Sequence, residues 1–363
     1  MTPDHMNVAA APAGGRSTEV PKREETPKSA ARDLSAMHVL DDDAVASLLA
    51  LDDLLGVVER AFLKQGRDEV ERPDRPHFPV GEGLDDRDEP AGTGLAMPAY
   101  VHGDPAYATK LASVFPGNAA ADVDRPTVQA QVLLTDAANG EPLALFAGER
   151  ITNARTGCIG GIAARELSAG PGPVDLAVIG AGQQARWQAR AIDAARGIDA
   201  VRIYSPTPDS REGCAADLRR EGIAAEAVDS AEAAVRDADV VVTATTSETP
   251  VFPGEALADG TLVVAVGAYE AGMCELDRAT FERADQVFAD VPDEVAAIGD
   301  IVDNGVDPAR LTPLSVVFEG DAGRESADEV IVVESVGSAV LDTATANYLW
   351  SEASAKDGVA IAF

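Results

Sequence analysis

The segment 174-VDLAVIGAGQQA-185 decides the fold, because it combines a buried strand, a glycine turn and the start of a helix. Its first part, Val174–Ile179, is a largely apolar run, as expected of a parallel strand buried on both faces. Gly180–Gly182 predicts a tight turn, and Gln183–Arg196 predicts a helix that Gly197 closes. A GxGxxA string is specific when it follows a strand and opens a helix in this way. The segment therefore predicts a unit that binds a dinucleotide.

The small residues of this turn have chemical reasons. Gly180 allows the turn, and the missing side chain at Gly182 lets a pyrophosphate approach the amides at the helix N-terminus. Ala185 is small enough for the helix to pack closely on the strand. The residues expected to contact the cofactor here are Gly180, Ala181, Gly182, Gln183 and Gln184.

The choice of dinucleotide depends on the end of the next strand, Val201–Tyr204. An acid at this point reads the ribose 2′-hydroxyl of NAD, whereas its absence beside Arg, Ser or Thr accommodates a 2′-phosphate. Ser205 holds the position, and Thr207 and Arg211 follow it, while Asp209 is better placed to cap a helix. The sequence therefore favours NADP(H) and leaves NAD(H) as the alternative.

Strands and helices continue to alternate after the turn, which predicts a Rossmann-type doubly wound α/β domain over residues 172–325. The segments that carry this alternation are Ala231–Arg236, Asp239–Ala244, Leu262–Val266 and Gln286–Ala289. Glu329–Val333 reads as a strand-like run beyond this domain, and Ser338–Ser351 as a helix that returns to the first part of the chain.

The first part of the chain predicts a sheet-rich α+β domain. Residues 1–34 are small and polar and predict a disordered tail. His38–Leu40 reads as a strand, and Val45 through Phe62 as one helix. Residues 72–150 alternate apolar strands with Pro/Gly turns, which indicates an antiparallel sheet. The expected substrate domain covers residues 35–171 and 326–363.

The composition excludes several kinds of partner. Subtracting 62 Asp and Glu from 29 Lys and Arg leaves a net charge of −33, which repels nucleic acid and anionic membrane surfaces. We find no apolar stretch near the ~20 residues that span a bilayer, and no secretory signal. The three cysteines suggest neither a disulfide framework nor a metal site, so we expect a cytosolic protein without a metal.

Lysine is scarce in this acidic chain, occurring at only five positions. A large acidic excess with few lysines is typical of proteins from salt-rich cytoplasms, where counterions screen the self-repulsion. We therefore expect a halophilic protein, against the simpler reading of an acidic mesophilic one.

Several strings together resemble the ornithine cyclodeaminase/mu-crystallin family in order and spacing over residues 37–350. They are Tyr107–Lys110 with Phe115–Asn118, Thr135–Asp136 with Gly140–Ala144, Ile151–Thr152 with Ala154–Gly157, the Gly180 turn, Ala265–Ala268, Gly323–Arg324 and Glu334–Gly337. The resemblance implies a sheet-rich dimerisation and substrate domain beside the dinucleotide domain, and a homodimer. It also implies hydride transfer between a nicotinamide and the α-carbon of an amino or imino acid.

The resemblance assigns roles to residues whose chemistry suits them. A planar arginine fork suits the carboxylate of an α-imino acid, and Arg75 and Arg155 are the candidates. Lys110 is expected to face the substrate, where a partly desolvated amine can move a proton. Further substrate contacts are expected from Ser335, Val336 and Gly337. Further cofactor contacts are expected from Thr127, Arg155, Thr245, Val266 and Gly267.

One departure from the family pattern separates the possible activities. Cyclodeaminases have an aspartate acid/base directly after the string that corresponds to Val266–Ala268, but this chain has Tyr269 followed by Glu270. Neighbouring side chains of a strand point to opposite sides, so Glu270 is a poor substitute. We therefore favour an α-imino acid reductase in which Lys110, or else Tyr269, supplies the proton. Ornithine cyclodeaminase, with Glu270 as catalyst, and a non-catalytic binding protein like mu-crystallin remain the alternatives.

Overall fold

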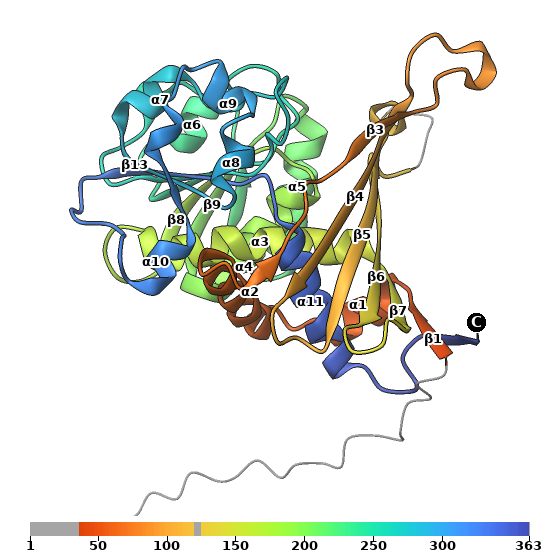
Figure 1. Ribbon diagram of the computed structural model, residues 1–363. Coiled ribbons are helices and arrows are strands. Elements are labelled where there is room, and N and C mark those ends of the chain that lie inside the picture. The colour runs from red at the N-terminus through yellow and green to blue at the C-terminus, as the bar shows by residue number, and fades with distance from the viewer. Residues whose placement is uncertain (1–35, 120–124, 363) are drawn as a thin grey trace, which may run out of the picture.

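Two eight-stranded sheets organise the computed structural model, which describes residues 36–119 and 125–362. Figure 1 shows the sheets as the cores of two units that lie side by side. The predicted disordered tail, residues 1–34, lies outside the described residues. The fold class agrees with the sequence prediction of a doubly wound unit beside a sheet-rich α+β unit.

The first sheet has the strand order β16-β1-β7-β6-β5-β4-β2, with β3 paired to β4. Its strands are β1 (Ala36–Leu40), β2 (Val70–Glu71), β3 (His77–Val80), β4 (Gly92–Val101), β5 (Ala106–Val114), β6 (Val128–Asp136), β7 (Pro142–Ala147) and β16 (Val359–Ala362). The predicted antiparallel pairing holds for β3 through β7. Strand β1, which lies outside the stretch 72–150 covered by that prediction, runs parallel to β7.

The second sheet is parallel throughout, with the order β10-β9-β8-β11-β12-β15-β13-β14. Its strands are β8 (Val174–Ile179), β9 (Ile198–Tyr204), β10 (Ala225–Ala227), β11 (Val240–Thr243), β12 (Leu262–Ala265), β13 (Ala284–Ala289), β14 (Leu311–Pro313) and β15 (Val330–Glu334). The apolar runs at β11 and β12 are buried on both faces, as a central parallel strand requires.

The sequence-based boundary at residue 326 was wrong. Strand β15 lies inside the parallel sheet, between β12 and β13, rather than in the first unit. All five of its side chains are buried, because the sheet covers both of its edges and helices cover its faces. The chain therefore returns to the first unit after Glu334, at helix α11.

Helices cover the sheets and join them. They are α1 (Asp42–Leu48), α2 (Leu51–Gly66), α3 (Gly148–Leu167), α4 (Gln183–Arg196), α5 (Pro208–Arg220), α6 (Ala231–Val235), α7 (Arg278–Arg283), α8 (Pro292–Val295), α9 (Gly299–Val302), α10 (Ser315–Glu319) and α11 (Ala339–Glu352). Short 3₁₀ turns lie at Leu84–Asp86, Pro116–Ala119, Gly254–Ala256 and Pro308–Arg310. No helix among the described residues combines the length and the apolar character that a membrane span needs.

The single helix predicted over residues 45–62 is two helices. Leu49 and Ala50 have extended backbones between α1 and α2. The N–H of Ala50 donates to the Tyr348 hydroxyl of α11 at 3.1 Å. A contact with another helix therefore provides the hydrogen-bond partner of this N–H at the break between α1 and α2. A local apolar pattern carries no information about this distant partner.

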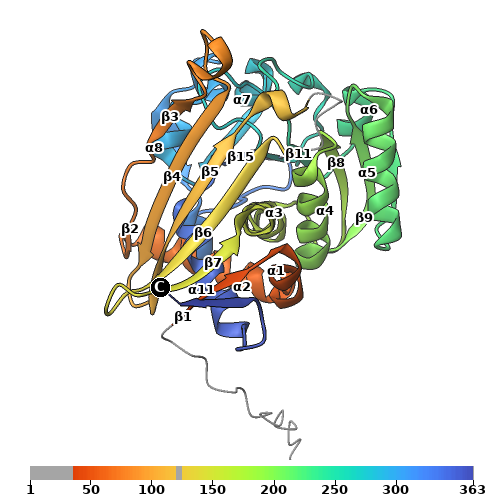
Figure 2. The same ribbon diagram turned by 90° about the vertical axis from the view of Figure 1, so that its right-hand side faces the viewer.

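Helix α3 connects the two units, and it lies between the first sheet and α4 (Figure 2). Its glycines allow close approach, because a Cβ at Gly157 would lie 2.7 Å from the carbonyl oxygen of Trp187. A Cβ at Gly161 would lie 2.6 Å from the carbonyl oxygen of Ala191. Helices α3 and α4 are therefore packed tightly against each other.

Candidate active site

The turn after β8 has the geometry of a phosphate-binding loop. Gly180 has a φ of +117°, and a Cβ there would lie 2.4 Å from the carbonyl oxygen of Ala244. A Cβ at Gly182 would meet no heavy atom within 4 Å, so space is open in front of the N-terminus of α4. Backbone N–H groups at a helix N-terminus favour anions. The turn thus fits a dinucleotide pyrophosphate.

Arg186 stabilises the backbone of this turn by hydrogen bonds. Its Nη1 donates to the carbonyl oxygens of Ala181 and Gly182, at 2.7 and 3.0 Å. Its Nη2 lies 2.6 Å from an oxygen of Asp217 on α5. The two carbonyl groups are therefore directed toward Arg186, which fixes the orientation of the peptide groups in the turn.

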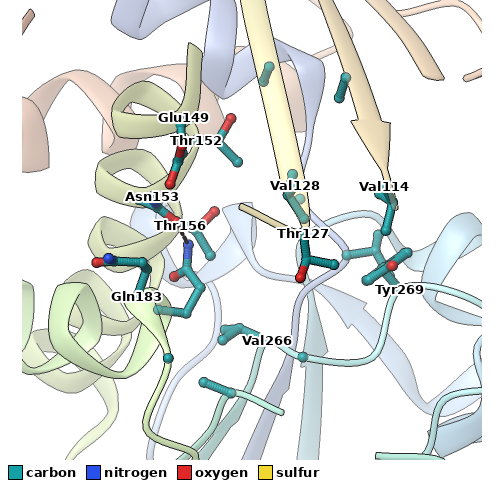
Figure 3. Close-up of a pocket in the computed structure, with 18 of the residues that line it drawn as sticks. Val114, Thr127, Val128, Glu149, Thr152, Asn153, Thr156, Gln183, Val266 and Tyr269 are labelled. Atoms are coloured by element: carbon teal, nitrogen blue, oxygen red, sulfur yellow. Dashed lines mark hydrogen bonds between the residues drawn. The ribbon is translucent and has the colours of Figure 1, made fainter. Parts of the chain in front are cut away.

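A cavity of about 550 Å³ extends from this turn to β5 of the first sheet. Figure 3 shows α3 on one side of it, the ends of β5 and β6 on the other, and Val266 below them. Fourteen residues expected at the site line this cavity. They are Arg75, Lys110, Thr127, Arg155, Gly182, Gln183, Gln184, Thr245, Val266, Gly267, Tyr269, Ser335, Val336 and Gly337.

One buried carboxylate joins the two cations that were expected to meet the substrate. Asp342 of α11 places Oδ2 2.6 Å from Nζ of Lys110, and Oδ1 accepts from Nε of Arg155 at 3.0 Å. Each of the three side chains is at most 5% exposed, and each comes from a different element. The cluster carries one net positive charge when Lys110 is protonated.

Burial sets the proton affinity of this cluster. It lowers the pKa of Lys110 to about 8, although Asp342 opposes the shift. Burial alone would raise the pKa of Asp342, but Arg155 and Lys110 outweigh it and hold that pKa below its ordinary value. Lys110 can therefore hold or release a proton near neutral pH, while Asp342 stays ionised.

The turn Ser335–Gly337 lines the cavity next to Arg155. The buried carboxylate of Asp290 accepts from the Ser335 hydroxyl at 2.7 Å, and from the N–H of Val336 and Gly337 at 3.2 and 2.8 Å. Gly337 has a φ of +76°, and a Cβ there would lie 2.6 Å from Nη1 of Arg155. A side chain at this position would push the guanidinium away.

Arg75 lies at the cavity but already has a partner. Its guanidinium forms an ion pair with Glu294 of α8, and Nη1 donates to the carbonyl oxygen of Val336 at 3.4 Å. Arg72 forms an ion pair with the same carboxylate. Arg75 therefore needs to share or leave Glu294 before it binds a substrate carboxylate.

The two residues after Ala268 lie in different places. Tyr269 lines the cavity, and burial together with Glu270 raises the pKa of its hydroxyl above the ordinary value. Glu270 is exposed and lies outside the cavity lining. Its inclusion as a catalytic candidate is not supported by this geometry, because Glu270 is not among the residues that line the cavity with Lys110 and Tyr269.

The residues expected at the adenosine ribose lie beyond β9, outside the cavity. Arg211 donates to the carbonyl oxygen of Ser205 at 3.0 Å and forms an ion pair with the exposed Asp229 at 2.7 Å. Its guanidinium also lies 5.8 Å from the ring centre of Tyr204. Thr207 is exposed at the N-terminus of α5. Gly180 and Ala181 form the phosphate turn itself and likewise do not line the cavity.

Sequence reasoning missed several residues of the site. Asp342 is an acid in the first turn of a largely buried helix, directly after Ala339–Leu341, which is the signal that could have identified it. One face of α3 carries polar side chains at helical spacing, and all of them line the cavity (Figure 3). These residues are Glu149, Thr152, Asn153 and Thr156.

Comparison with known proteins gives consistent matches over most of the chain. The model of the ornithine cyclodeaminase/mu-crystallin family matches residues 35–357. A Delta(1)-pyrroline-2-carboxylate reductase from Bacillus cereus is 35% identical over 272 residues, which cover 72% of this chain and 82% of the relative.

Two solved structures resemble this structure closely. The Delta(1)-pyrroline-2-carboxylate reductase from Thermococcus litoralis, in complex with NADH and L-proline, has a TM-score of 0.81 and 31% identity. The match covers 87% of this chain and 97% of that one. An archaeal alanine dehydrogenase dimer with bound NAD also has a TM-score of 0.81, at 30% identity over 90% of this chain and 99% of its own.

Proposed function

The chain belongs to the ornithine cyclodeaminase/mu-crystallin family, and from that premise we propose that it reduces a cyclic α-imino acid with a nicotinamide cofactor. The cluster of Lys110, Asp342 and Arg155 carries the proposal. It places two cations at one end of a cavity whose other end is the phosphate-binding turn. A relative acts on Delta(1)-pyrroline-2-carboxylate, which is an imino acid of this class.

Arg155 and Arg75 are the two residues that would bind the substrate carboxylate. Nε of Arg155 is occupied by Asp342, so the Nη edge of the guanidinium is the part left for a substrate carboxylate. Arg75 supplies a second fork once it leaves Glu294. We place the substrate between the two units, over the carboxyl ends of the parallel strands.

Imine reduction requires a hydride at carbon and a proton at nitrogen. When bound, the reduced nicotinamide supplies the hydride. Lys110 supplies the proton, because it lies at the cavity and its pKa is lowered to about 8 by burial. The C=N double bond becomes a C–N single bond with one new hydrogen on each atom. The Tyr269 hydroxyl is the second candidate donor.

The shape and polarity of the cavity favour reduction over ornithine deamination. The part of the wall that β4, β5 and β6 form beside Lys110 carries apolar side chains, which suit a hydrocarbon ring and offer no partner to a second ammonium group. These residues are Leu95, Met97, Ala112 and Ala130. Glu149 is the one carboxylic acid among the described residues that line the cavity, and it lies on α3.

The test is a panel of cyclic imino acids and of 2-oxo acids with ammonia or methylamine, followed by NAD(P)H absorbance in high-salt buffer. We expect stoichiometric oxidation of the cofactor with a cyclic imino acid. A parallel incubation with ornithine and catalytic NAD should form no proline or ammonia. Proline formation without net cofactor use would replace this proposal with the lyase. Cofactor binding without any turnover would favour a mu-crystallin-like binding protein.

We propose NADP(H) as the preferred cofactor, with NAD(H) as the alternative. Ser205 puts no carboxylate at the ribose position, and Arg211 donates to its carbonyl oxygen at 3.0 Å. The Asp229 carboxylate that now pairs with Arg211 is exposed, so it can move aside at small cost.

We also propose a homodimer that forms through the first sheet. Figure 1 shows α3 and α11 on one side of that sheet. By strand alternation, the outward positions of β4, β5 and β6 carry no charged side chain among the described residues, although the chain has a net charge of −33. They include Leu111, which is 52% exposed. A second copy is a suitable partner for such a face, as in the dimeric alanine dehydrogenase. Light scattering of Leu111→Asp in high salt should show a monomer.

The excess of acidic side chains leads us to propose adaptation to a salt-rich cytosol. All three cysteines are buried and unpaired, which agrees with a reducing compartment. Many of the acidic side chains are exposed, so counterions can screen them.

A further inference from the structure

Glu275 is a fully buried carboxylic acid that is hydrogen-bonded to two residues of the cavity lining. Its Oε1 accepts from the N–H of Thr245 at 2.6 Å, and its Oε2 accepts from the N–H of Gly267 at 2.8 Å. Oε2 also accepts from the Thr243 hydroxyl at 2.9 Å. Among the described residues, no Lys, Arg or His forms an ion pair with it, so hydrogen bonds alone compensate its burial.

The N–H groups of Thr245 and Gly267 come from equivalent positions, just past the ends of two neighbouring strands. Thr243 ends β11 and is paired with Ala265, which ends β12. Thr245 and Gly267 each follow two residues later, and both line the cavity. One carboxylate therefore accepts hydrogen bonds from the segments that follow both strands. A Cβ at Gly267 would lie 2.2 Å from the carbonyl oxygen of Thr245, which shows how close they are.

A second acid fixes Glu275 in place. Asp300 of α9 accepts from the N–H groups of Glu275 and Leu276, at 2.6 and 2.7 Å. Its carboxyl and that of Glu334 also face Glu275 electrostatically. Within the described part of the chain, no group of such acids is arranged to hold a metal ion. The role of Glu275 is therefore one of hydrogen bonding.

The positions of Thr245 and Gly267 indicate which part of the cofactor would lie against them. The phosphate turn lies at Gly182, and the hydride acceptor must lie beside Lys110, so the reacting half of the cofactor spans the floor between them. Thr245 and Gly267 form this floor. We infer that Glu275 is a positioning residue that fixes the floor under the nicotinamide, and that it leaves the adenosine half unaffected. This inference rests on the proposed function, because it requires a nicotinamide nucleotide in the cavity.

The chemistry of the side chain explains why an acid stands here. A carboxylate only accepts, and its two oxygens can take three donors at once. Glutamine would present an NH₂ group to one of the donors and lose at least one bond. Protonation of Glu275 would have a similar effect, and burial raises its pKa to about 7. The groups that face it are the donors of Thr243, Thr245 and Gly267 and the carboxyls of Asp300 and Glu334.

The test compares a whole cofactor with its adenosine half. Calorimetry measures the binding of NADPH and of 2′-phospho-AMP, the adenosine half of NADPH, to the wild type, to Glu275→Gln and to Thr243→Val. We expect Glu275→Gln to weaken NADPH binding about 10- to 100-fold, the range for a lost hydrogen bond to a charged group, and to leave the fragment unchanged. Thr243→Val removes one donor and should weaken NADPH binding less. In the wild type, NADPH binding should weaken relative to the fragment below about pH 7, and Glu275→Gln should lose this dependence.

Two outcomes would overturn the inference. Glu275→Gln with wild-type affinity for NADPH would show that the floor does not depend on this acid. Equal weakening of both ligands in both variants would make Glu275 a residue of the core alone. A wild-type protein that binds the fragment but no nicotinamide nucleotide would instead refute the proposed function.

Discussion

Replacing Asp342 with asparagine tests the proposed proton donor. The substitution keeps the shape of the side chain but removes the negative charge that lies 2.6 Å from Lys110 and 3.0 Å from Arg155. Lys110 and Arg155 then lose the buried acid that they share. Removing one partner of a buried pair costs about 3–5 kcal/mol. We expect the free energy of unfolding to fall by about this amount.

The same substitution should move the pH profile of the reductase. Imine reduction needs protonated Lys110, so the rate falls as pH rises through its pKa of about 8. Asp342 raises that pKa, and losing a close opposite charge lowers it by roughly 1–3 units. A drop of ~2 units would reduce the protonated fraction at pH 7.5 from about three quarters to about 3%. We expect kcat/KM at pH 7.5 to fall about 25-fold and to recover toward more acidic pH.

The assay is kcat/KM for a cyclic imino acid at saturating NADPH between pH 5.5 and 9.5, in high salt. Asp277→Asn is the control, because Asp277 accepts from the backbone N–H groups of Gly254 and Thr280 rather than from Lys110 and lies outside the cavity lining. The control should lose stability and keep its pH midpoint. If Asp342→Asn also keeps the wild-type midpoint, Lys110 is not the proton donor.

Three further predictions use other parts of the molecule. Ser205→Asp should shift the preference toward NADH, measured by titrating both cofactors, and a wild type that already binds NADH more tightly would contradict the reasoning. The thermal midpoint should rise from dilute buffer to molar KCl, where the screening length is about 3 Å, and a flat or falling midpoint would exclude salt adaptation. Gly337→Ala should raise KM for the imino acid and leave cofactor affinity unchanged, because the new Cβ would lie 2.6 Å from Nη1 of Arg155 at a φ of +76°. Unchanged KM would show that Arg155 has room to move.

Much of the fold follows from local patterns in the sequence. The helix predicted over Gln183–Arg196 has those bounds in the structure, because a glycine turn starts it and Gly197 ends it. The main strands of both sheets were also predicted, since their apolar runs are bounded by turn residues. The boundary at 326 failed because an apolar strand such as Val330–Glu334 does not show which sheet it joins.

The candidate site could be predicted only where a motif marks it. The cavity lining includes Lys110, Arg155 and Gly182, which stand in recognisable strings. Asp342 and Glu275 stand in no string that was used, and they act through contacts with residues far away in the sequence or across a loop. The ion pair between Arg75 and Glu294 likewise depends on how the two units meet.

The pairing of β1 with β16 has a consequence for biosynthesis. About 320 residues separate the two strands, so β1 leaves the ribosome long before its partner exists. At roughly 5–20 residues per second, that interval lasts about 15–60 s. During this time the edge of β1 that later pairs with Val359–Ala362 has no partner strand from this chain, and free edges template aggregation. Newly made chains should therefore depend on chaperones until the first sheet closes.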